Sequence, residues 1–270
     1  MKTIKILMLA GCLVIAGLVS AAILTKKDAG DKNKVSANAA DDNGFAVVEL
    51  FTSEGCSSCP PADELVARVQ KEYAGKPVYI LAYHVDYWNR LGWKDVFSKA
   101  EYSQRQSKYA QWLNLRSVYT PQAVVNGQKE FVGSSTGTLH NAIIAGLRKS
   151  TNAALVITEV HATNKQATVK YTTEGAPGNA ALLLAVVQKK AVSNVKRGEN
   201  GGRTLTHVQI VREIENVTLE GKRSGTATIT LPANFSAREY EIIGFVQNSA
   251  SGEILAASRS AFNTTDIASN

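Results

Sequence analysis

Apolar positions in the first part of the chain alternate between short continuous runs and helical spacings. Residues 45–51 and 78–84 are mostly apolar and rich in β-prone side chains, which predicts two buried strands. Between them, apolar side chains from Leu65 to Tyr73 recur every three or four positions after Pro60, which predicts a helix. A strand, a helix and a strand within about 40 residues form a βαβ unit, so the two strands are expected to run parallel.

The same mixture continues to about residue 150. Two further helices and a pair of strands are predicted over 94–115, 136–150, 118–125 and 129–132. Asn126-Gly127, between the two strands, is the strongest hairpin signal in the chain and makes them antiparallel. The boundary of this region lies near residue 150, where the helical spacing of apolar residues ends and strand patterns take over.

After residue 151 the helical spacings disappear. Seven strand candidates follow, separated by turn-forming residues, over 155–160, 167–171, 181–188, 206–217, 226–231, 240–247 and 253–257. Seven short strands within about 110 residues are typical of a β-sandwich of the immunoglobulin-like kind. We therefore expect an all-β sandwich domain over 151–262 and a short tail over 263–270.

The N-terminal residues carry a targeting pattern. Residues 1–24 begin with two lysines and continue as an uncharged apolar run, which indicates a secretory signal peptide with small residues for cleavage at 19–21. The run is also long enough for a retained membrane anchor, and LAGC at 9–12 resembles a lipoprotein-processing box. All three interpretations place the protein in the periplasm or outside the cell. Residues 25–44 are polar and predict a flexible linker.

Composition and charge bear on whether the protein binds nucleic acid. The chain is 44% hydrophobic and 20% charged, as expected for a globular protein. Its net charge is +7, but the lysines and arginines are scattered and form no run typical of nucleic-acid binding. We expect a solvated surface charge and no nucleic-acid partner.

The cysteines supply the candidate chemistry. Cys12 lies in the signal, so cleavage leaves Cys56 and Cys59 as a CxxC pair in a compartment that permits disulfides. A disulfide across so short a loop restrains the unfolded chain little, and zinc would need further ligands that the sequence does not offer at a suitable spacing. Reversible redox chemistry without a cofactor is therefore favoured. Copper delivery remains an alternative, with His84 as a third ligand at the end of its strand.

The context of the pair favours a thioredoxin-like α/β domain over 45–150. A strand feeding a CxxC that opens a helix is typical of that fold. Cys56 at the helix N-terminus is expected to be the nucleophile, because the helix dipole stabilises a thiolate there. Cys59, one turn later, is expected to resolve the mixed disulfide.

Three other residues are candidate members of this site. Thr120 and Pro121 begin a strand where a thioredoxin-like fold places a cis-proline beside the dithiol, and the Thr120 backbone would pair with an extended substrate. Glu49, in a central strand, could accept the Cys59 proton if burial raises its affinity for protons. Glu54 is expected to be a surface charge.

Two loops remain open to interpretation. The aromatic segment 84–93 is expected near the carboxyl end of the sheet, either as a substrate wall or as packing over the core. The charged, glycine-rich segment 196–203 either folds over the dithiol or bonds across a domain interface. An interface role is slightly favoured.

Four segments together resemble the DUF1223 family of uncharacterised secreted bacterial proteins. They are VVELFTSEGCSSCPPAD, LAYHVDYWNRLGWKD, YTPQAVVNGQKEFVG and RGENGGRTLTHVQIVR. The resemblance runs from about Phe45 to the last strands and implies a thioredoxin-like N-terminal side, with Cys56 and Cys59 as the redox pair and Pro121 as the cis-proline. Unlike ordinary thioredoxins, the chain has Gly55 before the first cysteine and two serines inside the motif.

The leading hypothesis is an exported thiol–disulfide oxidoreductase whose partners are protein thiols and disulfides of the cell envelope. A non-catalytic binding or adhesion module on a thioredoxin scaffold is the main alternative, because sandwich domains often serve recognition. Copper delivery is the third.

Overall fold

A computed structural model describes residues 44–163 and 165–263, and all of them belong to one compact unit, Asp41–Asn270. The predicted signal or anchor, nearly all of the predicted linker and most of the predicted tail lie outside the described residues. Within the described residues, no helix is both long enough and apolar enough to cross a membrane.

The first part of the chain contains the predicted elements in the predicted order. They are β1 (Ala46–Thr52), α1 (Pro60–Glu72), β2 (Val78–His84), α2 (Ala100–Trp112), β3 (Gln122–Val125), β4 (Lys129–Val132) and α3 (Thr136–Arg148). A short 3-10 helix that was not predicted, η1 (Asn89–Leu91), lies between β2 and α2. Strands β1 and β2 are parallel, as the βαβ pattern predicts. The third strand starts only after Pro121, because proline has no N–H group to donate to the ladder.

The second part also contains the expected number of strands. They are β5 (Ala154–Ala162), β6 (Gln166–Glu174), β7 (Ala180–Asn194), β8 (Thr204–Thr218), β9 (Ser224–Thr230), β10 (Tyr240–Asn248) and β11 (Ile254–Ala261). Strands β7 and β8 have 15 residues each, more than the sequence pattern indicated. The two strands form a long hairpin whose loop is the segment 196–203, and the half of β8 next to this loop includes the buried residues Leu205, His207 and Val208.

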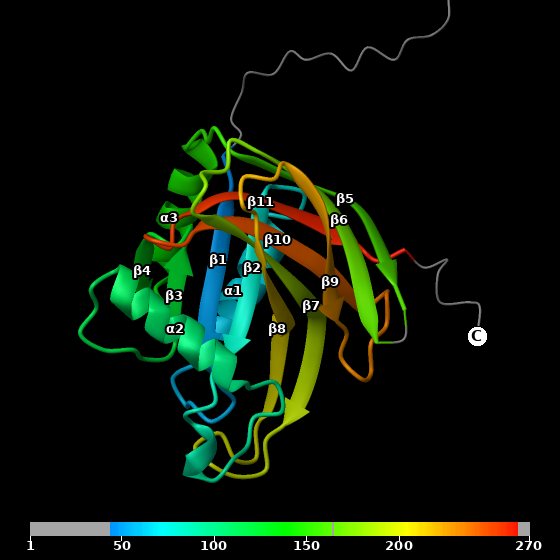
Figure 1. The fold of residues 1–270 in the computed structure, drawn as a ribbon. Helices are drawn as coiled ribbons and strands as arrows, with labels where there is room; N and C mark the ends of the chain where they lie inside the picture. Colours follow the sequence, from blue (N-terminus) through cyan, green and yellow to red (C-terminus); the bar gives the residue numbers. More distant parts are fainter. Residues whose placement is uncertain (1–43, 164, 264–270) are drawn as a thin grey trace, which may run out of the picture. The chain divides into compact units, whose positions relative to one another are not determined.

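The predicted fold class, a thioredoxin-like α/β domain followed by a separate β-sandwich, is wrong. The described residues form one mixed eight-stranded sheet in the order β11-β10-β7-β8-β2-β1-β3-β4, and a three-stranded sheet in the order β5-β6-β9 (Figure 1). The two halves of the large sheet join where β8 pairs with β2 in parallel, with Ala82 opposite Ile210. Strands from both sides of residue 150 therefore share one sheet.

The alternation of side chains along β1 and β7 explains the layers. In β1, Val48 and Leu50 pack with α1 and α3 on one face, whereas Phe51 packs toward α2 on the other face. In β7, Leu182 and Leu184 form a core with the three-stranded sheet. Since successive strand residues point to opposite faces, each of these strands contributes to two cores at once.

Candidate functional site

The CxxC segment follows β1 and forms a tight turn before α1. The Cys56 amide donates to the Ser53 carbonyl oxygen (3.1 Å), and the Cys59 amide donates to the Cys56 carbonyl oxygen (3.2 Å). Cys56 and Cys59 form a disulfide, with their Cα atoms 5.4 Å apart. Cys59 is the N-cap residue of α1, and Pro60 is its first helical residue. Cys56 therefore lies ahead of the helix.

The first turn of α1 offers few amides to a sulfur atom. Pro60 and Pro61 have no N–H group, and the amides of Ala62 and Asp63 both donate to the Cys59 carbonyl oxygen (2.9 and 3.2 Å). The Ser58 hydroxyl oxygen lies within hydrogen-bond distance of Cys56 Sγ, at 3.4 Å. Stabilisation of a Cys56 thiolate would therefore depend more on this serine than on the helix terminus.

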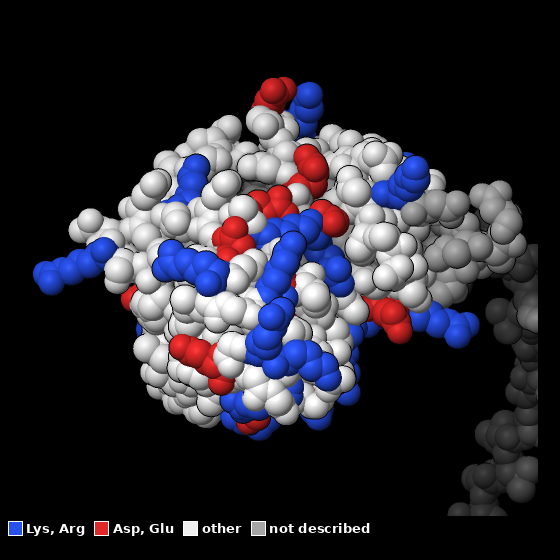
Figure 2. Space-filling view, turned by 90° about the horizontal axis from the view of Figure 1, so that it is seen from below, with Lys and Arg blue, Asp and Glu red and all other residues white. Residues whose placement is uncertain are grey.

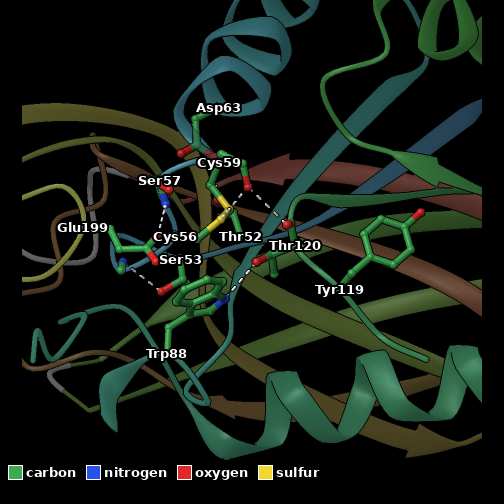
Figure 3. Close-up of a disulfide and its surroundings, with 12 residues drawn as sticks. Thr52, Ser53, Cys56, Ser57, Cys59, Asp63, Trp88, Tyr119, Thr120 and Glu199 are labelled. Carbon is green, nitrogen blue, oxygen red and sulfur yellow. Dashed lines mark hydrogen bonds between the residues drawn. A yellow bond between two sulfur atoms is a disulfide. The ribbon is translucent and has the colours of Figure 1, made fainter. Parts of the chain in front are cut away.

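Both sulfur-bearing side chains are fully buried (0% exposed). Thr120 lies beside them: its carbonyl oxygen accepts from Ser58 Oγ (3.5 Å), and its hydroxyl oxygen accepts from the Trp88 indole N–H (2.8 Å) (Figure 3). The Thr120–Pro121 peptide bond is cis. The structure thus brings Cys56, Cys59, Thr120 and Pro121 into one site.

Trp88, from the aromatic segment after β2, covers the turn. Its Cβ atom would lie 3.1 Å from a Cβ atom added at Gly55. That distance is too short for most side chains unless Trp88 moves. Gly55 therefore leaves room for an aromatic side chain supplied from another loop.

The loop between β7 and β8 also covers the disulfide. Asn200 is fully buried, and its Nδ2 atom donates to the carbonyl oxygens of Glu54 and Cys56, both at 2.9 Å. The neighbouring Glu199 carboxylate accepts a hydrogen bond from the Ser57 amide (3.0 Å). The segment folds over the dithiol turn, and the same hydrogen bonds join the second half of the chain to the first, so the two arrangements considered for this segment occur together.

A buried polar cluster, formed by Thr52, Glu54, Asp63 and His207, lies beneath the turn. The Thr52 hydroxyl donates to Asp63 (2.9 Å), and the His207 ring nitrogens lie 3.5 Å from Asp63 Oδ2 and 3.6 Å from Glu54 Oε1. Glu54 is 0% exposed, so the expectation of a surface charge is wrong. Sequence reasoning missed Asp63, although its position four residues after Cys59 places it on the same face of α1.

His84 is held by a separate hydrogen bond. Its Nδ1 atom lies 2.7 Å from Asp95 Oδ2, and both residues are buried. Burial raises the pKa of Asp95, but His84 and the backbone amides of Glu54 and Phe97 outweigh it and lower that pKa. Within residues 44–163 and 165–263, no group of three or more His, Cys, Asp or Glu side chains could hold a metal ion.

The sequence of this site belongs to a segment that matches a known protein family. Residues 47–247 match the family described as "Protein of unknown function (DUF1223)". This chain belongs to the DUF1223 family. The matched range includes the CxxC turn, the Thr120–Pro121 bond and the loop that covers them.

Two solved structures resemble this DUF1223 protein. Protein AGR_C_4864 from Agrobacterium tumefaciens has 29% sequence identity and a TM-score of 0.60, over 83% of this chain and 97% of that one. HBP35 of Porphyromonas gingivalis has 18% identity and a TM-score of 0.57, over 85% and 79% of the two chains, and this likeness concerns the fold alone. No protein with a curated description matches the sequence.

Glu49 of the DUF1223 protein is buried but lies on the other face of the sheet from α1. Its carboxylate accepts from Arg105 Nε (2.6 Å) and from the Tyr109 hydroxyl, both on α2. Cys59, by contrast, begins α1 on the opposite face. The structure therefore does not bring Glu49 together with Cys59, whereas Glu54 and Asp63 are buried carboxylates on the cysteine side.

The protonation of His207 predicts a pH-dependent stability. Burial lowers the pKa of His207, but the Asp63 and Glu54 carboxylates outweigh burial and raise that pKa from 6.5 to about 9. Between these values the folded protein holds a proton that the unfolded chain has lost. The stabilisation is complete below pH 6.5 and disappears as the pH rises through 9, a decrease on the order of 3 kcal/mol.

Urea unfolding between pH 6 and pH 9.5 measures this decrease. The His207→Gln variant is expected to lose the slope. The His140→Gln variant is the comparison. Hydrogen bonds to Glu72 and to the Thr136 carbonyl oxygen raise the pKa of His140 as well, but this surface pair is expected to account for only a small part of the wild-type slope. A wild-type stability that stays constant over this range would contradict the assignment.

Proposed function

We propose that this DUF1223 protein is a thiol–disulfide oxidoreductase that acts on cell-envelope proteins through Cys56 and Cys59. The observation that carries the proposal is a disulfide formed by a CxxC turn between a central strand and a helix, with Thr120, which precedes Pro121 through a cis bond, beside it. The envelope assignment rests on the signal-like residues 1–24. Protein thiols and disulfides are the proposed partners.

The chemistry needs only the two cysteines and a substrate disulfide or dithiol. In the reducing direction, the Cys56 thiolate attacks a substrate disulfide, an S–S bond forms between them, and one substrate sulfur leaves and takes a proton. Cys59, after losing its proton, attacks Cys56 Sγ and releases the second substrate sulfur. The protein dithiol loses two electrons and the substrate disulfide gains them. The reverse sequence oxidises a substrate dithiol.

Burial of the disulfide sets a condition on this reaction. Because both cysteine side chains are fully buried, no substrate sulfur can reach them while Asn200 and Trp88 hold their positions. Exchange therefore requires the 196–203 loop to move away from the turn. The Ser58 hydroxyl is then a candidate to stabilise a thiolate, and the Asp63 carboxylate is a candidate to take a proton.

Insulin reduction tests the proposal. Residues 44–270 are purified, and the turbidity of insulin chains released in the presence of dithiothreitol is followed over time. The wild type is expected to accelerate precipitation, whereas Cys56→Ser is expected to behave as dithiothreitol alone. Equal rates for wild type and Cys56→Ser would sink the proposed activity.

A second candidate function is a binding module in which the disulfide only anchors the turn. The full burial of both sulfurs favours it. The two candidates differ in the ease of reduction: an exchange site should be reduced by glutathione at neutral pH, and an anchoring disulfide should resist it. Copper delivery would be tested by dialysis against Cu(I), with the Cys56→Ser, Cys59→Ser double variant as the control.

A further inference from the structure

Two loops that are far apart in the sequence meet at the disulfide end of the sheet. A Cβ atom added at Gly198 would lie 3.2 Å from Trp93 Cβ and 3.6 Å from the Leu91 carbonyl oxygen, so the loop after β2 touches the β7–β8 loop. The same β7–β8 loop contacts Cys56 through Asn200. The rim around the dithiol is thus built from these two segments.

This rim is basic. Its cationic side chains are all exposed: Arg90, Lys94, Lys196, Arg197 and Arg203. We call these five residues the basic rim. Figure 2 views the protein from this end and shows Lys and Arg side chains in a band across the middle of the face, with fewer Asp and Glu beside them.

Most members of the basic rim have no counter-charge. In the described part of the chain, the Lys and Arg ion pairs involve other residues, and Arg203 donates to Asn200 rather than to a carboxylate. Fewer carboxylates than cations are exposed at this end, among them Glu64 in α1 and Glu199. Glu54 and Asp95 are buried, and Glu199 accepts from the Ser57 amide. The exposed charge around the dithiol is therefore predominantly positive.

Apolar side chains are exposed beside the same charges. Leu91 is 51% exposed, Val96 is 66% exposed and Val192 is 57% exposed, and they belong to the loop after β2 and to the end of β7. Leu91 and Val96 come from one loop, and exposed apolar side chains that lie close together next to charge are typical of surfaces that bind another molecule. The rim thus combines electrostatic attraction with apolar contact.

We propose that the basic rim recognises acidic segments of the proteins whose disulfides or dithiols this protein exchanges. This inference rests on the proposed function and adds its substrate class. Charge complementarity determines the choice of an acidic partner, because a cationic surface raises the local concentration of acidic segments. Electrostatic steering of this kind speeds association by roughly 10-fold to 1000-fold at low ionic strength. A protein segment is favoured over an anionic lipid surface because the rim surrounds a disulfide, which reacts with protein sulfurs.

Three model substrates separate recognition from chemistry. Each is a disulfide-linked peptide dimer whose single cysteine is flanked by acidic, basic or uncharged residues. Rates of exchange with the dithiothreitol-reduced protein are measured at low and at high sodium chloride. We expect the wild type to react with the acidic dimer about tenfold faster than with the uncharged dimer at low salt, and to lose this preference at high salt.

Charge-reversed variants locate the preference. Lys196→Glu with Arg197→Glu is expected to remove the advantage of the acidic dimer, measured as the ratio of its exchange rate to that of the uncharged dimer with the same variant. Lys196→Gln with Arg197→Gln should have an intermediate effect. The control is Lys76→Glu with Arg148→Glu, because these exposed residues lie near the starts of β2 and β1, at the other end of the strands. This control should keep the wild-type preference.

The outcomes distinguish the two proposals. If the wild type reacts with the uncharged dimer but shows no preference for the acidic dimer, the inference is overturned and the proposed function stands. If the wild type reacts with none of the dimers, both are overturned. Binding of the protein to phosphatidylserine vesicles without any preference for the acidic dimer would also overturn the inference, because the rim would then serve a membrane.

Discussion

Replacing Arg105 by alanine is expected to lower the free energy of unfolding by about 3–5 kcal/mol, the usual cost of removing one partner of a buried ion pair. Arg105 is 10% exposed and Glu49 is 0% exposed. Burial lowers the pKa of Arg105, but the Glu49 carboxylate outweighs it and keeps that pKa well above its usual range, so the guanidinium stays charged. Without Arg105, the Glu49 carboxylate would be buried next to a cavity.

The surroundings of Arg105 make the expected loss of stability larger than the loss expected for an exposed ion pair. Its guanidinium lies 5.1 to 5.5 Å from the ring centroids of Tyr109, Phe245 and Tyr83. It also donates to Gln247 Oε1 (3.2 Å), which connects α2 with β10. The charge therefore holds together elements from both halves of the sheet.

Urea denaturation of variants checks this prediction. Lys108→Ala, on the exposed side of the same helix, is the matched control and should change stability by less than about 0.5 kcal/mol. The double variant Glu49→Leu, Arg105→Met should recover most of the loss, because it removes both charges and retains side-chain volume. An Arg105→Ala variant as stable as Lys108→Ala would show that the pair does not stabilise the fold.

Replacing Asn200 by alanine is expected to speed reduction of the Cys56–Cys59 disulfide between about tenfold and thirtyfold. Asn200 Nδ2 makes two buried hydrogen bonds to carbonyl oxygens of the CxxC turn, each worth about 1 kcal/mol. Their loss favours the state in which the loop has moved away, and the rate of reduction follows the population of that state. Under native conditions, alkylation of the released thiols and mass spectrometry measure the rate.

Asn194→Ala is the control for this variant. Asn194 lies in the same hairpin but accepts only from the Thr204 hydroxyl at an exposed position (2.8 Å). Its replacement removes the same side chain without touching the CxxC turn, so the wild-type rate is expected. Equal rates of reduction for Asn200→Ala and the wild type would mean that the loop does not limit access to the disulfide.

Local pattern was a sufficient guide to most individual elements. The apolar runs and spacings predicted β1, α1, β2 and the seven later strands, because each depends on residues a few positions apart. Cys56, Cys59, Thr120 and Pro121 were also found from sequence, since CxxC after a strand and Thr-Pro before another are local signals. Asp63 could have been found from its spacing to Cys59.

Contacts between distant segments were not predictable in this way. Nothing near Glu49 in the sequence indicates that Arg105 and Tyr109 bind its carboxylate, and sequence alone favours a role as proton acceptor for Cys59. Likewise, His207 and Glu54 are separated by 153 positions in the sequence and meet only in the folded protein. Long-range pairing of this kind depends on which strands become neighbours.

By itself, the sequence determined that the chain forms a βαβ unit with a CxxC turn, followed by a series of strands, and that it resembles DUF1223 proteins. Only the tertiary structure decided that β8 joins β2 and makes one sheet of both halves. That pairing carries the β7–β8 loop to the disulfide, where it buries the cysteines and gathers scattered lysines and arginines into a rim. The physical reason is that strand periodicity specifies which side chains are buried but not which edge a strand will pair with.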